Sequence, residues 1–509
     1  MRNKEIKLGI VLSYFQMGLG IIISLIYTPL MIRFLGKSEY GLYNTVASTI
    51  SMMSILSLGF NSSYIRYYIK YKKNNDIENI NKLNGLYLVI FTIIGLIACF
   101  CGIFLSLNLR YVFKDGLSNT EYITAKTLMI LLTCNLSFSF PMSVFSNIIS
   151  AHERFIFLKT LLLLKTVFSP LLSIPLLYFG YGSIAIVFST IFVSLVTDLL
   201  YLFYCVKILR VKFCFRNFEK GLFKDILFFT SFIAINMIVD QINLNVDKIL
   251  LGRFKGTEIV AIYSVGFTLF IYFQQFSTSI SSLFAPSIHS MANKFEGMTN
   301  DYYFTDVFVK VGRIQLMILG LLCTGFIFFG RSFIYFWAGN GYDEAYFVML
   351  LLCVSSIVPL SQNIGVEVQR SLNKHKFRSI VYLLMALINI VLSIILCQLY
   401  GAIGCAIGTA ISFIIANGII MNVYYYKKCK INIFSYWKSF LKISCGLVIP
   451  CVCGFLMKSF FPQNTVFYLF ISILIYTFIY CISIWIIALN RNEKAIIIGK
   501  FRNLRGEKK

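Results

Sequence analysis

Apolar runs of about 20 residues recur along this chain, and each is long enough to cross a lipid bilayer as a helix. Hydrocarbon cannot hydrate backbone N–H and C=O groups, so runs of this length fold as transmembrane helices. The sequence is 58% hydrophobic and 13% charged, with a mean hydropathy of +0.79, which excludes a soluble domain. We expect an all-α integral membrane protein with about 14 transmembrane helices. The predicted spans are 8–32, 42–65, 85–108, 123–149, 160–179, 182–206, 225–250, 258–289, 311–330, 343–366, 379–399, 402–426, 440–461 and 465–489.

The distribution of Lys and Arg predicts the orientation, because cytosolic loops of membrane proteins are enriched in these residues. Most of the 46 basic residues lie on one side if the N-terminus is cytosolic. An even number of spans then places both termini in the cytosol. The formal net charge of +25 therefore reflects topology and attraction to anionic headgroups. Nucleic-acid binding is disfavoured because the charge lies in short loops between spans.

A short motif occurs twice, each time between two predicted spans. Residues 33–43 read RFLGKSEYGLY, and residues 253–263 read RFKGTEIVAIY. Arg, Phe, Gly and the final Tyr coincide at a separation of 220 residues. Residues 181–184 (YGSI) and 400–403 (YGAI) match at nearly the same separation. Repeated membrane units of this length are typical of transporters.

The repeat predicts the organisation of the chain. We expect an N-lobe of six spans at 1–210 and a C-lobe of six spans at 211–430, related by a pseudo-twofold axis along the membrane normal. Residues 431–509 would add a C-terminal helix pair, spans 13 and 14, and a basic cytosolic tail. Loops between the spans are short, so no outer catalytic loop is expected.

Two opposite charges lie within adjacent spans at similar predicted depth. Lys165 is on the fifth span and Asp198 is on the sixth. Ionisable residues inside a membrane are costly, so they face a cavity or a partner. Two interpretations stay open. The pair neutralises itself, or Lys165 faces the central cavity and binds an anion.

The seventh span carries a polar stripe on one helix face, at spacings of four, three and four residues. It consists of Asn236, Asp240, Asn243 and Asp247. Such a face cannot contact lipid, so it either joins helices or lines a cavity. Asp240, near mid-membrane, is the candidate ion-coupling residue. Gln275 on the eighth span and Asn44 on the second extend the cavity candidates.

Arginines at span ends form the remaining set of candidates. Each of them either extends its side chain to the lipid headgroups or binds a phosphate group, and the sequence leaves both roles open. They are Arg33, Arg66, Arg253, Arg313, Arg331 and Arg370. The 14 cysteines are scattered without a CxxC pair, and the chain has no Asp-x-Asp motif. We therefore predict no metal site, no catalytic residue and no cofactor, apart from possible H⁺ or Na⁺ coupling.

Three segments resemble a known family. They are residues 29–43 (PLMIRFLGKSEYGLY), the positions Leu58-Gly59 and Arg66 that follow, and residues 247–252 (DKILLG) before Gly256 and Tyr263. They are similar to the Wzx-type polysaccharide flippases, in the polysaccharide transporter branch of the multidrug/oligosaccharidyl-lipid/polysaccharide exporter superfamily.

The resemblance implies a flippase of the bacterial plasma membrane. Its cargo would be undecaprenyl-pyrophosphate-linked oligosaccharide for O-antigen, capsule or exopolysaccharide synthesis, carried to the outer leaflet by alternating access. Polysaccharide polymerase and glycosyltransferases of the pathway would be partners. A cationic cavity is implied, which Lys165, Arg33 and Arg66 fit. Asp240 and Asp247 do not suit a pyrophosphate and would contact sugar hydroxyls or a coupling ion.

Three alternatives remain. An ion-coupled multidrug exporter of the same superfamily would also use carboxylates within its spans. A peptidoglycan-precursor lipid flippase would share the fourteen spans and differ in its cargo. A membrane-embedded sugar polymerase or ligase would carry a large outer loop with catalytic residues, which this chain lacks.

Overall fold

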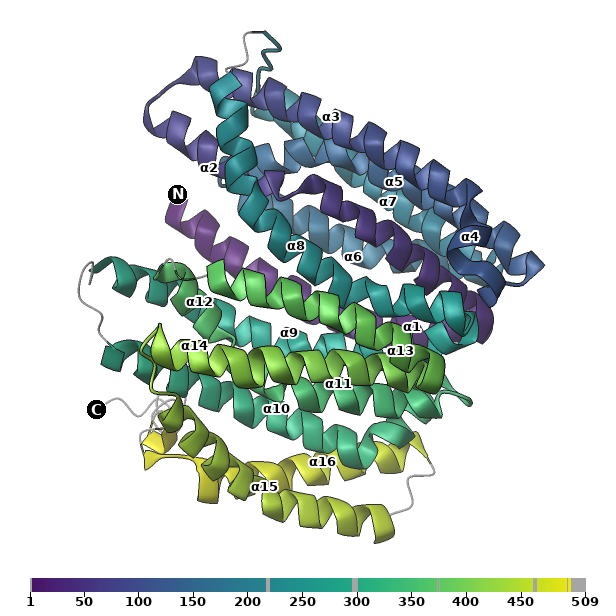
Figure 1. The fold of residues 1–509 in the computed structure, drawn as a ribbon, viewed down its shortest axis with the longest axis vertical. Coiled ribbons are helices and arrows are strands. Elements are labelled where there is room, and N and C mark those ends of the chain that lie inside the picture. The colour runs from purple at the N-terminus through teal and green to yellow at the C-terminus, as the bar shows by residue number, and fades with distance from the viewer. Residues whose placement is uncertain are drawn as a thin grey trace. The chain divides into compact units, whose positions relative to one another are not determined.

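The computed structural model describes residues 2–216, 220–294, 301–372, 374, 376–460, 465–491 and 493–495. Helices account for every regular element of these residues (Figure 1). The first half comprises α1 (Arg2–Met52), η1 (Met53–Ser57), α2 (Phe60–Lys73), α3 (Ile77–Leu107), α4 (Leu109–Phe113), η2 (Lys114–Gly116), α5 (Asn119–Ala151), α6 (Phe155–Tyr178), α7 (Gly182–Phe203), η3 (Tyr204–Ile208) and α8 (Lys220–Phe254). The second half comprises α9 (Thr257–Lys294), α10 (Asp301–Ala338), α11 (Asp343–Ser361), α12 (Ile364–Ser371), α13 (Lys376–Phe413), η4 (Ile414–Met421), α14 (Asn422–Lys427), α15 (Ile433–Phe460), α16 (Val466–Ser483) and η5 (Ile484–Ala488).

Two glycines turn the chain between consecutive spans. Within the described residues, eleven helices are long and apolar enough to cross a membrane, or twelve when the bent helix at 223–254 is counted. Two of them, at 11–73 and 376–427, are 63 and 52 residues long, more than twice a single span. Each contains a glycine in a non-helical conformation, Gly36 (φ 73°) and Gly401 (φ 57°). Division at these turns, with the bent helix counted, gives fourteen spans within the described residues, in agreement with the predicted all-α membrane fold.

Packing divides the chain into two compact units. Unit 1 contains residues 1–264 and 382–408, and unit 2 contains residues 265–381 and 409–509. These units are defined by contacts between residues. The lobe boundaries that the repeat predicts, at 210 and 430, therefore stay a prediction.

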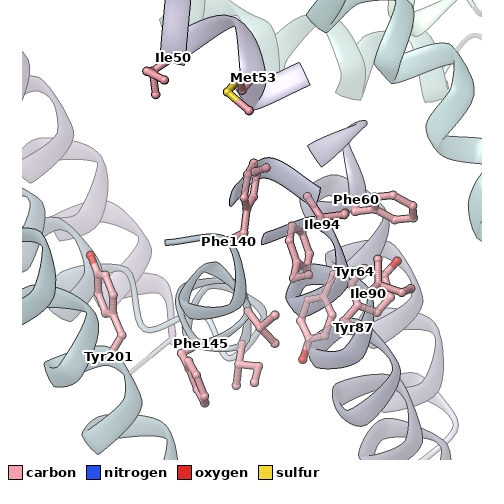
Figure 2. Packing of buried hydrophobic residues seen from close by; sticks show 14 of the residues in the cluster. Ile50, Met53, Phe60, Tyr64, Tyr87, Ile90, Ile94, Phe140, Phe145 and Tyr201 are labelled. Atoms are coloured by element: carbon pink, nitrogen blue, oxygen red, sulfur yellow. The ribbon is translucent and has the colours of Figure 1, made fainter. Parts of the chain in front are cut away.

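Aromatic side chains from α2, α3 and α5 lie in the hydrophobic core of unit 1 (Figure 2). The rings of Tyr64 and Tyr87 pack edge to face with centroids 5.1 Å apart. The Tyr64 hydroxyl donates to Asn84 Oδ1 at 2.7 Å, and the Tyr87 hydroxyl lies 2.6 Å from Ser63 Oγ. Both buried hydroxyls are thus satisfied, as a core without water requires.

Polar contacts fasten the helices of unit 2. Gln315 on α10 donates from Nε2 to the hydroxyls of Ser277 and Ser281 on α9, at 3.0 and 2.6 Å. Arg313, two residues before Gln315 on α10, is buried and forms a two-pronged ion pair with Glu493, which follows the last span. Arg313 was expected to snorkel or to clamp a phosphate. Its guanidinium instead holds the C-terminal span to α10.

Candidate functional site

The two repeats of the sequence contact each other within unit 1. Ser38 Oγ of the first repeat lies 3.3 Å from Thr257 Oγ1 of the second, and these positions are 219 residues apart. A Cβ atom at Gly41 would overlap the carbonyl oxygen of Thr257 and lie 3.2 Å from the backbone nitrogen of Ala261. Backbone therefore touches backbone at this crossing, which a side chain at position 41 would prevent. Gly41 and Ala261 are corresponding positions of the two repeats, whereas Ser38 and Thr257 are offset by one residue; all four lie at the predicted outer end of the spans.

Glu121 joins the two repeats through one carboxylate oxygen. Both Ser38 Oγ and Thr257 Oγ1 donate to Glu121 Oε1, the latter at 2.6 Å. The other oxygen, Oε2, accepts the backbone N–H of Ser118 at 2.8 Å in a capping box at the start of α5. We name Ser38, Glu121 and Thr257 the repeat clasp. Sequence reasoning missed Glu121, although its capping box, Ser-x-x-Glu, was a visible signal.

Other residues of the repeats hold short connections between spans. Glu39 accepts the N–H and hydroxyl of Ser183 at 2.6 and 2.7 Å, so its carboxylate caps the start of α7. Arg253 donates to the carbonyl oxygen of Val112 at 3.1 Å. A Cβ atom at Gly116 would overlap the carbonyl oxygen of Gly252 in the same region. Arg253 thus fixes the connection between α3 and α5, while Arg33 is exposed.

Lys165 and Asp198 lie on the adjacent helices α6 and α7, as predicted, and both are half-buried. Each side chain acts electrostatically on the other. No direct ion pair or hydrogen bond joins them within the part of the chain that the structure describes. The ammonium group therefore keeps donors for an anionic ligand, and the carboxylate lowers the electrostatic cost of holding the cation.

The polar stripe of α8 divides into an exposed part and a buried part. Asn236 and Asp240 are exposed, and Asn243 is half-buried. Asp247 is 5% exposed and accepts a hydrogen bond from Tyr263 Oη at 2.7 Å. Tyr263 is the last residue of the second repeat. The Asp247 carboxylate thus joins α8 to α9, whereas Asp240 is exposed and its ion-coupling role stays a prediction.

Three further candidates have local contacts. Arg66 is exposed, and its guanidinium lies 4.2 Å from the ring centroid of Phe229, a cation–π geometry. Asn44 donates to the carbonyl oxygen of Tyr40 at 2.8 Å, and Gln275 of unit 2 is half-buried. The described residues contain no group of three or more His, Cys, Asp or Glu side chains placed to hold a metal ion. Roles in cargo binding stay a prediction for all of them.

Residues 9–291 match the family model described as "Polysaccharide biosynthesis protein", which spans more than half of the chain. The chain belongs to this polysaccharide biosynthesis family. The resemblance inferred from its motifs is confirmed. A Shigella flexneri protein, provisionally named an O-antigen transporter, is 20% identical over 413 residues, which cover 78% of this chain and 92% of the relative.

Solved structures share the fold of this polysaccharide biosynthesis protein. The lipid II flippase MurJ, in an inward-closed conformation, superposes with a TM-score of 0.68 at 20% identity and covers 93% of this chain and 98% of its own. An inward-facing multidrug resistance MATE transporter of the MOP superfamily gives a TM-score of 0.62 at 14% identity, over 83% and 95%. The chain therefore shares the fold of these two membrane proteins.

Proposed function

We propose that this polysaccharide biosynthesis protein moves undecaprenyl-pyrophosphate-linked oligosaccharide from the cytosolic to the outer leaflet by alternating access. The family, the provisional name of the Shigella relative and the shared fold support this class of cargo. The observation that carries the mechanism is the repeat clasp. Two repeats that meet through three side chains, at the predicted outer end, form a closure that can open without breaking a helix.

In this proposal Lys165 binds the pyrophosphate from the cytosolic side. Its charge within the span attracts the anion. When no anion is bound, Asp198 lowers the electrostatic cost of holding the Lys165 charge within the membrane. Arg66, exposed at the predicted cytosolic end of its span, brings the anionic headgroup to the site, whereas Arg33, exposed at the predicted outer end, would contact the headgroup on the outer side. The two predicted six-span lobes would then rock, and release of the repeat clasp would expose the glycan outside. The protein would lie in the bacterial plasma membrane with cytosolic termini, beside the pathway's polymerase and glycosyltransferases.

A double-cysteine variant tests the closure. Because the hydroxyl oxygens of Ser38 and Thr257 are 3.3 Å apart, Ser38→Cys with Thr257→Cys should form a disulfide when oxidised. A bacterial strain lacking its own polysaccharide flippase would be complemented with the variant, and surface glycan and the lipid-linked intermediate would be measured. We expect oxidation to stop glycan export and to accumulate the intermediate, and a reductant to restore export.

The single-cysteine variants are the matched controls, since they contain one half of the bridge and all the native thiols. Export that continues with the bridge fully formed would show that the repeat clasp does not open during transport. Failure of the wild-type chain to restore glycan, despite normal protein levels, would remove this cargo from the proposal.

A multidrug exporter is the second candidate, and the exposed Asp240 within a span favours it. An accessible intramembrane carboxylate suits a cationic drug or a coupling ion. Ion-driven dye efflux from vesicles, abolished by Asp240→Asn and independent of polyprenyl lipid, would support this function. Rescue of a strain depleted of its peptidoglycan-precursor flippase would instead assign lipid II as cargo.

A further inference from the structure

An apolar groove runs along unit 2 between α11, η4 and the first turns of α15. Its volume is about 590 Å³, within the range of small-molecule sites. Its walls include Phe347, Val354, Pro359, Ile414, Ile419 and Trp437. Ser355 also lines it, but the Ser355 hydroxyl donates to its own helix, to the carbonyl oxygen of Leu352 at 3.1 Å. We name this feature the α11–η4 groove.

The local backbone explains why the two helices leave a gap. η4 is a π-helix, whose wider turn displaces side chains from the α-helical register. Gly418 contributes no side chain to the wall, and a Cβ atom there would meet only Ile414 Cγ2, at 3.8 Å. On the facing helix, Pro359 cannot donate a backbone hydrogen bond and disturbs the regular turn of α11.

The walls of the groove are exposed at the protein surface. Phe347, Val354, Ile414 and Ile419 are each about half exposed, at 49%, 51%, 50% and 57%. In a multi-pass membrane protein, such a surface borders lipid hydrocarbon. The α11–η4 groove therefore accepts an extended apolar chain from the bilayer and offers it no polar partner.

Exposed lysines lie in the chain segment that connects η4 to α15. α14 directly follows η4, and four exposed lysines lie in or beside the turn between α14 and α15. They are Lys427, Lys428, Lys430 and Lys438. None of them has an ion pair with a carboxylate among the residues that the structure describes. Lys438 directly follows Trp437, and Lys427 is eight residues after Ile419, or about 12 Å along a helix.

We propose that the α11–η4 groove binds one acyl chain of an anionic glycerophospholipid, whose headgroup phosphate is held by these four lysines. The apolar walls accept the chain, and the amphipathic indole of Trp437 suits the boundary between chain and headgroup. A zwitterionic lipid carries no net charge and gains less from the lysines. The site belongs to unit 2, and none of the cargo-binding candidates named above lines it.

The test measures lipid binding to the purified full-length protein by native mass spectrometry, with phosphatidylglycerol and phosphatidylcholine of identical chains as probes. We expect phosphatidylglycerol to bind about tenfold more tightly than phosphatidylcholine. The variant in which all four lysines are replaced by Gln should lose this preference. Gly418→Leu fills the groove and should reduce binding of both lipids. Gly325→Leu on α10 is the matched control, because a Cβ atom there meets nothing within 4 Å and Gly325 does not line the groove.

Val354→Trp, on the exposed wall, is a second filling variant if Gly418→Leu lowers the melting temperature. Equal binding of the two lipids to the wild-type protein would overturn the proposal. The proposal would also be overturned if the groove-filling variants bound both lipids as tightly as the Gly325→Leu control does. Displacement of phosphatidylglycerol by undecaprenyl phosphate, with no displacement in the reverse direction, would assign the groove to the carrier lipid and also refute the proposal.

Discussion

Removal of Glu493 should destabilise unit 2 strongly, because Arg313 would keep a buried charge without its counter-ion. The Arg313 side chain is 4% exposed, and its Nε and Nη2 donate to the Glu493 carboxylate at 2.7 and 2.8 Å. Breaking a buried pair by removing one partner costs about 3–5 kcal/mol. Glu493 is 23% exposed, and the Ala488 carbonyl oxygen still accepts from Arg313 at 2.8 Å. We therefore expect Glu493→Ala to cost about 3 kcal/mol, the lower end of that range.

Thermal inactivation of the protein in detergent measures this effect, because membrane proteins often unfold irreversibly and their stability is then a rate. If the pair breaks in the rate-limiting step, about 3 kcal/mol shortens the half-life by roughly a hundredfold. The double variant Arg313→Met with Glu493→Met should recover most of the loss, since it leaves no unpaired charge.

Asp343→Ala is the matched control, because it breaks an exposed ion pair. Arg331 and Asp343 are 67% and 64% exposed, and such pairs contribute about 1 kcal/mol or less. Equal half-lives for Glu493→Ala and Asp343→Ala would refute the argument that burial makes Glu493 necessary.

Three other predictions concern unit 1. Gly41→Ala should separate the repeats, since its methyl group would overlap the Thr257 carbonyl oxygen, and it should abolish oxidative crosslinking of the Ser38/Thr257 cysteine pair. Lys165→Gln should stop glycan export at normal protein levels, whereas Lys165→Arg should retain part of it; unchanged export by Lys165→Gln would remove Lys165 from the cargo site. Burial, with nearby cations, lowers the pKa of His152 below its ordinary value, although a backbone hydrogen bond raises it. The unfolded chain then binds more protons, so stability should fall as the pH decreases below about 6.5, and His152→Asn should flatten that slope in melting curves.

The spans were predictable because each is set by a local property, a run of apolar residues of bilayer length. Gly36 and Gly401 lie between predicted spans, and the structure turns the chain at both. Contacts between distant side chains were not predictable in the same way. Glu121 binds residues 83 and 136 positions away, and Glu493 binds one 180 positions away. Neither the residue spacing nor the composition around Glu121 and Glu493 indicates which residues they bind.

Helical periodicity assigned the polar stripe of α8 to one face, but it could not say what that face contacts. The face changes its surroundings along its length: Asp240 is exposed, whereas Asp247 is enclosed and bound by Tyr263. Both interpretations, a seam that joins helices and a cavity lining, assumed one environment for the whole stripe. In the structure its two ends have different surroundings.

The groups that the two carboxylates bind decide which contact can open and close during transport. Glu493 holds a buried guanidinium, so its contact breaks at the cost of stranding a charge. Glu121 in the repeat clasp holds two hydroxyl groups, and each such hydrogen bond to a charged group contributes about 1.5–3 kcal/mol. The Glu121 carboxylate is only half-buried and keeps the N–H of Ser118 when the hydroxyls separate, so water can hydrate it and opening leaves no buried, unpaired charge. A closure that must open once per transport cycle requires a contact that breaks reversibly, as in the repeat clasp. A contact that must persist is better made by a buried ion pair, as between Arg313 and Glu493. On this ground we expect the opening to occur where the repeats meet and the contact between Arg313 and Glu493 to persist throughout the cycle.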